Sequence, residues 1–97
     1  MLTSINPANN KLIRSYNEMT NGEYEKIILL ADKAFNSWRE TSFERRFELM
    51  KNAAKVLRKN SEEYSALMTI EMGKPIVQSR AEVEKCALVC EYYANNA

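Results

Sequence analysis

Glycine and proline are scarce in this chain, whose 97 residues contain only two of each. Turn-rich all-β folds and flexible linkers need many more of these residues, so their scarcity argues against both. The 45% of apolar and 28% of charged residues are ordinary for a globular protein. We therefore expect a small, mostly helical domain. Its own core should be marginal, because a chain this short buries only about 60–65% of its unfolded surface.

Charge and residue types exclude several classes of function. A net charge of +1 argues against a nucleic-acid partner and against an acidic tail. Histidine is absent, which removes imidazole bases and the commonest zinc ligand. The longest apolar run, Ile27–Ala31, is far shorter than the roughly 20 residues of a membrane span, and the first residues do not resemble a secretory signal. With only two cysteines as well, we expect a cytoplasmic protein without a membrane partner.

The chain is expected to begin with a β-hairpin and to continue as helices. Two short apolar segments, Leu2–Ile5 and Leu12–Tyr16, flank a turn rich in proline and asparagine. Thr20 and Glu23 then form a capping box, which predicts a first helix. Its apolar residues recur every three or four positions and include Trp38, so this stripe is expected to lie in the core.

Three more helices follow in the prediction. A second capping box over Thr41–Glu44 starts one, and Asn60 or Ser61 caps the next, which ends at Gly73. Pro75 suits the first position of a fourth helix, because its missing N–H would have no partner there. The apolar stripe of this last helix reaches Ala97 without a stop signal. The chain is therefore expected to be cut off from a longer protein.

Few side chains form a convincing chemical centre. Cys86 and Cys90 are four residues apart and suit a metal or redox pair, but core packing is preferred because no further cysteine or histidine completes a site. The basic second helix could face phosphates, although a solvated face balanced by nearby acids is preferred. Gly22 and Gly73 are too far apart for a glycine-rich phosphate loop.

The motifs taken in order nevertheless resemble the start of an aldehyde dehydrogenase. The resemblance extends from Ser4 to Ala97 in both identity and spacing. The residues that carry it are Ser4–Ala8, Ala34–Arg39, Arg45–Arg46, Glu71–Pro75, Glu82–Val83 and Tyr92–Ala94. The segment Glu71–Pro75, followed by Arg80–Cys86, is most similar to the branch that uses succinate semialdehyde.

The resemblance implies a fold and an activity. Residues 1–97 would form the N-terminal, outer part of the Rossmann-like cofactor-binding domain of an α/β protein, with a hairpin over residues 1–19 and about four amphipathic helices over residues 20–97. The parent enzyme would oxidise a small aldehyde to the acid with NAD or NADP, as a homodimer or homotetramer. Cys86 and Cys90 do not match the family nucleophile. We therefore expect no catalytic residue, no cofactor-binding residue and no activity in this chain alone.

Two candidate sites also come from the resemblance. The carbonyl of Ile5 and the carboxylate of Glu71 correspond to family ligands of a monovalent cation, and such oxygen donors suit a hard ion. The last predicted helix resembles a family helix that borders the substrate entrance, and Glu82 and Lys85 are expected on its exposed side. An ordinary surface ion pair is nevertheless the preferred interpretation of these two residues.

The competing hypothesis comes from a different class of protein. If the chain ends naturally at Ala97, it could act as a non-catalytic helical interaction module.

Overall fold

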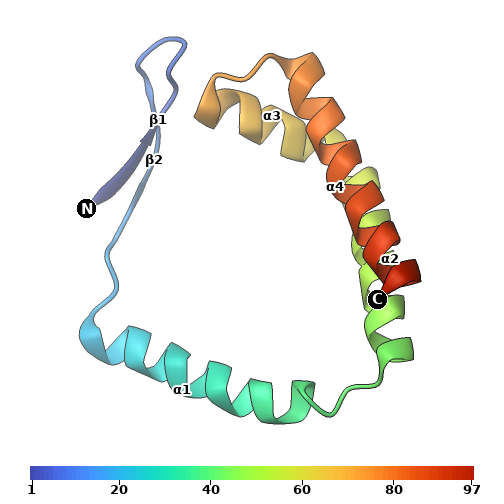
Figure 1. The fold of residues 1–97 in the computed structure, drawn as a ribbon. Helices are drawn as coiled ribbons and strands as arrows, with labels where there is room; N and C mark the ends of the chain where they lie inside the picture. The colour runs from blue at the N-terminus through green and yellow to red at the C-terminus, as the bar shows by residue number, and fades with distance from the viewer.

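The computed structural model describes all 97 residues and contains a two-stranded hairpin followed by four helices (Figure 1). The elements are β1 (Leu2–Ile5), β2 (Leu12–Tyr16), α1 (Asn21–Trp38), α2 (Phe43–Lys59), α3 (Ser61–Met72) and α4 (Ile76–Asn96). About 70% of the residues are helical. The predicted fold class, a hairpin followed by four helices, is therefore confirmed.

The hairpin pairs its strands antiparallel, with Leu2 opposite Tyr16 and a bulge between Ser4 and Ile5. Its turn depends on asparagine side chains. The Asn6 Oδ1 accepts a hydrogen bond from the Ala8 N–H at 2.9 Å, and Asn10 adopts a positive φ of 60°. Asparagine tolerates both roles better than most residues, which explains the abundance of asparagine in this turn.

Each helix begins close to the predicted residue. Thr20 and Glu23 form the complete capping box of α1. The predicted box over Thr41–Glu44 is displaced by one residue, because the Ser42 side chain accepts from the Arg45 N–H. Pro75 likewise precedes α4 rather than occupying its first turn, and its ψ of 137° keeps it extended.

Helices α2, α3 and α4 form the packed part of the chain. Figure 1 shows α4 running alongside α2, with α3 crossing near one end of the pair. All six buried residues lie in these helices and are small or β-branched: Ala54, Ser65, Ser79, Val83, Ala87 and Ala94. Buried hydroxyls are paired, since the oxygens of Thr69 and Ser79 lie 2.9 Å apart. The core therefore contains few residues, and its buried hydroxyls have hydrogen-bond partners.

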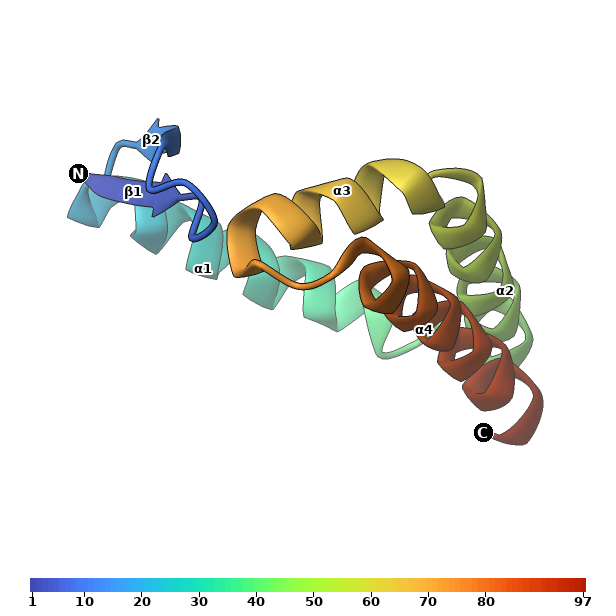
Figure 2. The same cartoon turned by 90° about the horizontal axis from the view of Figure 1, so that it is seen from above.

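Helix α1 does not belong to this core. Figures 1 and 2 show it extending away from α2 and α4, and none of its residues is buried. Trp38 is 46% exposed and Phe35 is 56% exposed. The prediction that Trp38 lies in the core is therefore wrong for this chain. The apolar period of α1 does mark one face of a helix, but this chain supplies nothing to cover that face.

The resulting shape is open. The radius of gyration is 17.5 Å, whereas a compact domain of this length has one of about 12.5 Å. The accessible surface is 7908 Å², against about 5,700 Å² for a compact protein of this mass. Apolar side chains of α1, α2 and α4 contribute to the excess. None of the helices is long and apolar enough to cross a lipid bilayer.

Gly73 ends α3 at a point where the turn of the hairpin lies close to the helix. Its φ is +70°, and a Cβ there would lie 2.9 Å from the Pro7 Cγ. Gly73→Ala should therefore lower the free energy of unfolding by about 1–2 kcal/mol from backbone strain alone. Gly22→Ala is the matched control, because nothing lies within 4 Å of its Cβ position. Urea unfolding followed by circular dichroism measures both. Equal stability of the two variants would contradict the role of Gly73.

Candidate functional site

The predicted cation ligands lie where the hairpin meets the C-terminal end of α3. The Ser4 hydroxyl donates a hydrogen bond to Glu71 Oε1 at 2.9 Å, which places this carboxylate beside β1, one residue from Ile5. Gly73 also lies close to Pro7, because a Cβ at position 73 would be 2.9 Å from the Pro7 Cγ. The junction thus brings together a carboxylate, a hydroxyl and the backbone carbonyls of a strand. Their oxygen atoms are ligands of the kind that hard cations prefer.

The two predicted entrance residues lie on α4 but do not pair with each other. Glu82 is half-buried and forms an ion pair with Lys74, across the turn that contains Pro75. Lys85 is exposed and takes part in none of the ion pairs of the chain. The preferred surface ion pair therefore exists for Glu82, with a partner that the sequence analysis did not name.

A second polar cluster connects α2 to α4. The Arg58 guanidinium donates to both carboxylate oxygens of Glu84, at 3.1–3.3 Å, and also to Glu91. These bonds raise the pKa of Arg58 and lower the pKa of Glu91. On α4, the Arg80 guanidinium donates to the Glu62 carboxylate of α3, and these hydrogen bonds lower the pKa of Glu62. Neighbouring acids thus compensate part of the basic charge of α2, as expected.

The two cysteines differ in burial. Cys86 is exposed and Cys90 is partly buried. The prediction that both lie in the packed face is wrong for Cys86, because the buried stripe of α4 runs through Val83, Ala87 and Ala94 and leaves Cys86 at its edge. No group of three or more histidine, cysteine or acidic residues could hold a metal ion. Neither thiol therefore belongs to a group of residues that could hold a metal ion.

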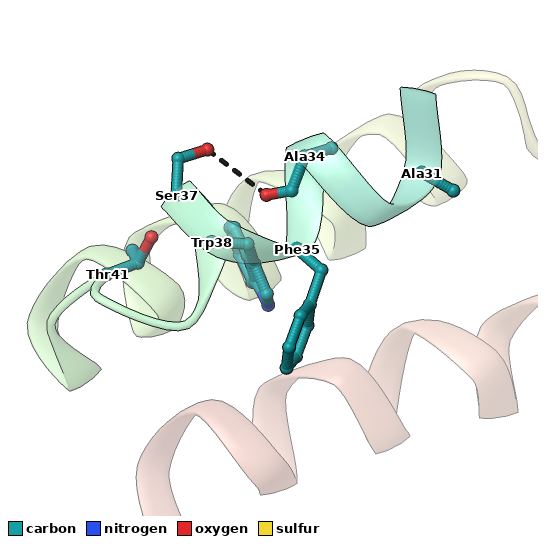
Figure 3. A pocket seen from close by; sticks show the side chains of 6 residues that line it. All are labelled: Ala31, Ala34, Phe35, Ser37, Trp38 and Thr41. Carbon is teal, nitrogen blue, oxygen red and sulfur yellow. Dashed lines mark hydrogen bonds between the residues drawn. The ribbon is translucent and has the colours of Figure 1, made fainter. Parts of the chain in front are cut away.

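The one pocket of the chain lies at the end of α1. Figure 3 shows the rings of Phe35 and Trp38 on the same side of α1 and the Ser37 side chain on the opposite side, while Thr41 lies in the turn after the helix. The Ser37 hydroxyl is occupied, since it donates to the Ala34 carbonyl at 3.1 Å. The pocket has a volume of about 620 Å³ and is lined mainly by carbon. The pocket therefore offers mainly apolar contacts, and none of its lining residues is ionisable.

Sequence comparison identifies the class of protein to which this arrangement belongs. The model of the aldehyde dehydrogenase family matches residues 1–97, and the chain belongs to that family. The predicted resemblance is therefore confirmed.

Particular relatives then place the chain more closely. It is 40% identical over 96 residues to a probable NADP-dependent succinate-semialdehyde dehydrogenase of Synechocystis. The aligned region covers 99% of this chain and 21% of that protein. It is 41% identical over 93 residues to the NAD(P)-dependent succinate semialdehyde dehydrogenase of Escherichia coli, covering 96% of this chain and 20% of the relative. The chain thus spans about a fifth of the length of the curated relatives it matches.

Solved structures agree with these relatives. The succinic semialdehyde dehydrogenase of Streptococcus pyogenes, in complex with NADP+, matches with a TM-score of 0.89 and 28% identity over 96% of this chain and 21% of its own. An NAD-dependent aldehyde dehydrogenase of Sinorhizobium meliloti matches with a TM-score of 0.88 and 28% identity, over 97% of this chain and 19% of its own. The open arrangement of hairpin and helices is therefore shared with much longer chains.

Sequence reasoning missed three positioning contacts. It named Glu71 but not its partner Ser4, and it explained Gly73 by the helix end without the approach of Pro7. It also named Arg46 only as part of a motif, although the guanidinium lies over the Trp38 ring. The partners are 67, 66 and 8 residues apart in sequence, and no local pattern reports contacts between separate elements.

The ion pairs of Arg58 and Arg80 predict how stability depends on pH. Glu91 and Glu62 have folded pKa values below the ordinary 4.5, so the unfolded chain binds protons more readily than the folded chain. Their contribution to stability is therefore complete above about pH 4.5 and is lost as the pH falls through the lowered values. The urea midpoint should accordingly decrease on acidification below this pH.

Arg58→Met should make that decrease smaller, because the pKa of Glu91 is then no longer lowered. Arg45→Met is the matched control on the same helix, since it removes only an exposed ion pair with Glu48 within α2. Urea titrations at a series of pH values measure both variants. An unchanged acid dependence in Arg58→Met would contradict the assignment of this effect to the α2–α4 cluster.

Proposed function

We propose that this chain serves as a segment of an NAD(P)-dependent aldehyde dehydrogenase that oxidises a small aldehyde, with succinate semialdehyde as the first candidate, to the carboxylic acid. The observation that carries the proposal is its identity of about 40%, along almost its whole length, to two enzymes named for that substrate. Because the chain spans about a fifth of those relatives, the activity is assigned to a longer protein that contains this segment.

In this proposal the segment is a scaffold and not a catalytic unit. The family reaction uses a cysteine that attacks the aldehyde, hydride transfer to the nicotinamide, and water that hydrolyses the thioester. Gly22 and Gly73 are the only glycines and lie on different elements, so no backbone of this chain fits a pyrophosphate cradle. We assign residues 1–19 and 20–97 to the hairpin and outer helices of the cofactor-binding domain, and no cofactor-binding residue.

The partners of the segment follow from the same proposal. The remainder of the dehydrogenase would be its first partner, and a homodimer or homotetramer would be the assembled form. The cytoplasmic location expected from the cysteine content stays a prediction. A free-standing helical interaction module is the less favoured alternative, because the relatives that match almost the whole chain are named as dehydrogenases.

The junction of Ser4, Ile5 and Glu71 is proposed as a site for sodium or potassium. The carboxylate of Glu71 and the carbonyl of Ile5 would be two ligands, and further oxygen ligands would come from sequence outside this chain. The hydrogen bond from Ser4 to Glu71 supports this proposal, because it brings the carboxylate to β1. Glu82 and Lys85 are proposed to border the substrate entrance, where the exposed ammonium of Lys85 would attract an anionic aldehyde.

The cation proposal is tested in a chimera. The segment replaces the matched fifth of the Synechocystis enzyme, and the melting temperature is compared in potassium chloride and in tetramethylammonium chloride at equal ionic strength. We expect a higher melting temperature in potassium, and we expect Glu71→Gln to abolish the difference while preserving the acceptor for Ser4. Glu63→Gln changes an exposed carboxylate on the same helix and should leave it intact. A potassium effect that survives in Glu71→Gln would refute the site.

The same chimera tests the proposed function. With succinate semialdehyde and NADP+ we expect an increase in absorbance at the reduced-cofactor band, because the segment would restore the scaffold of the cofactor-binding domain. The 97-residue chain alone should give a flat trace. Cys86→Ser and Cys90→Ser should leave the activity of the chimera unchanged. A folded but inactive chimera, or activity of the chain alone that Cys86→Ser abolishes, would overturn the proposal.

A further inference from the structure

Helix α1 is joined to the packed helices only at its C-terminal end, while its N-terminal end follows the hairpin. It leads into α2 through residues 39–42, has no buried residue and extends away from the packed helices (Figure 1). Hydrogen bonds within the turn, such as that from the Thr41 N–H to the Trp38 carbonyl at 2.9 Å, close the turn but do not reach α2. Some other contact must therefore fix the direction of α1 relative to α2.

Arg46 makes that contact from the first turns of α2. Its Nη2 donates to the Trp38 carbonyl at 3.0 Å and to the Arg39 carbonyl at 3.4 Å. These carbonyls belong to the C-terminal end of α1, where backbone oxygens lack helical partners and the helix dipole favours a positive charge. The last turn of α1 contains no basic residue of its own. A cation from the next helix supplies what α1 lacks.

The same guanidinium also lies against rings of both helices. Its carbon is 5.2 Å from the centre of the Trp38 ring, at the end of α1, and 5.7 Å from the centre of the Phe43 ring, at the start of α2. Such distances are typical of cation–π contacts. Its Nε is buried and has no hydrogen-bond acceptor. The Arg46 side chain thus combines two hydrogen bonds and two ring contacts with one buried N–H group that has no acceptor.

The structure assigns Arg46 the role of a positioning residue that sets the direction of α1 relative to α2 and α4, and with it the direction of the Phe35–Trp38 face. The flat guanidinium contacts two rings while its Nη2 donates to two carbonyls, so the compact ammonium of lysine would replace it only in part. This inference goes beyond the proposed function, because it concerns the orientation of an element and not the reaction. It holds whichever substrate the longer protein uses.

A distance measurement between α1 and α4 tests this role in the full 97-residue chain. Spin labels are attached to Lys26→Cys on α1 and to the exposed native Cys86 on α4, with Cys90→Ser to remove the second thiol. Double electron–electron resonance then reports the distribution of distances. We expect a narrow distribution in the parent, a broad one in Arg46→Met, and an intermediate width in Arg46→Lys.

Arg45→Met is the matched control, since it removes the neighbouring arginine, whose partner Glu48 lies within α2, and it should keep the parental width. Acrylamide quenching of Trp38, the only tryptophan, should increase in Arg46→Met and stay unchanged in Arg45→Met. A parental width in Arg46→Met with an intact helical signal would overturn the inference, as would a broad distribution in the parent. If Arg46→Met loses its helical signal, Arg46→Lys decides: broadening supports the role and a parental width refutes it.

Discussion

The contact between α2 and α4 is the interaction on which the rest of this chain depends. Its centre is made of alanines, including Ala54 and Ala87, whose small side chains allow two helices to approach closely and are fully buried. Arg58 closes the contact at the surface by binding two carboxylates of α4. Because so few residues are buried, close approach and satisfied polar groups replace the large side chains that usually fill a core.

Two elements are then attached to this unit by small numbers of directional contacts. The hairpin meets α3 through Ser4 and Glu71 and through the approach of Pro7 to Gly73. Helix α1 meets α2 through Arg46. Hydrogen bonds and close backbone approach depend on geometry, whereas apolar burial does not. The shape of this open chain therefore depends on a few positions, and we expect substitution there to change orientation more than helix content.

The sequence predicted the local structure well and the packing poorly, for a physical reason. Hairpin bounds, the capping box of Thr20 and the helix end at Gly73 depend on neighbouring residues and were predicted correctly. Burial of Trp38 and Cys86 depends on what covers them, which no periodicity reports. The partners of Glu71 and Glu82 were likewise missed, because those contacts join separate elements. Family resemblance identified Glu71 as a candidate ligand, but it gave no geometry.

The exposed apolar face of α1 supports the proposed scaffold role of this chain. A segment that leaves Trp38 half-exposed and keeps a surface well above that of a compact protein is shaped to be covered by further structure. Its polar side chains form ion pairs, caps and helix-end contacts, and none of them combines a nucleophile with a base. Sequence identity of about 40% therefore carries information about scaffold positions. In the proposed function, the chemistry of the family would be carried out by residues that such a scaffold holds in place.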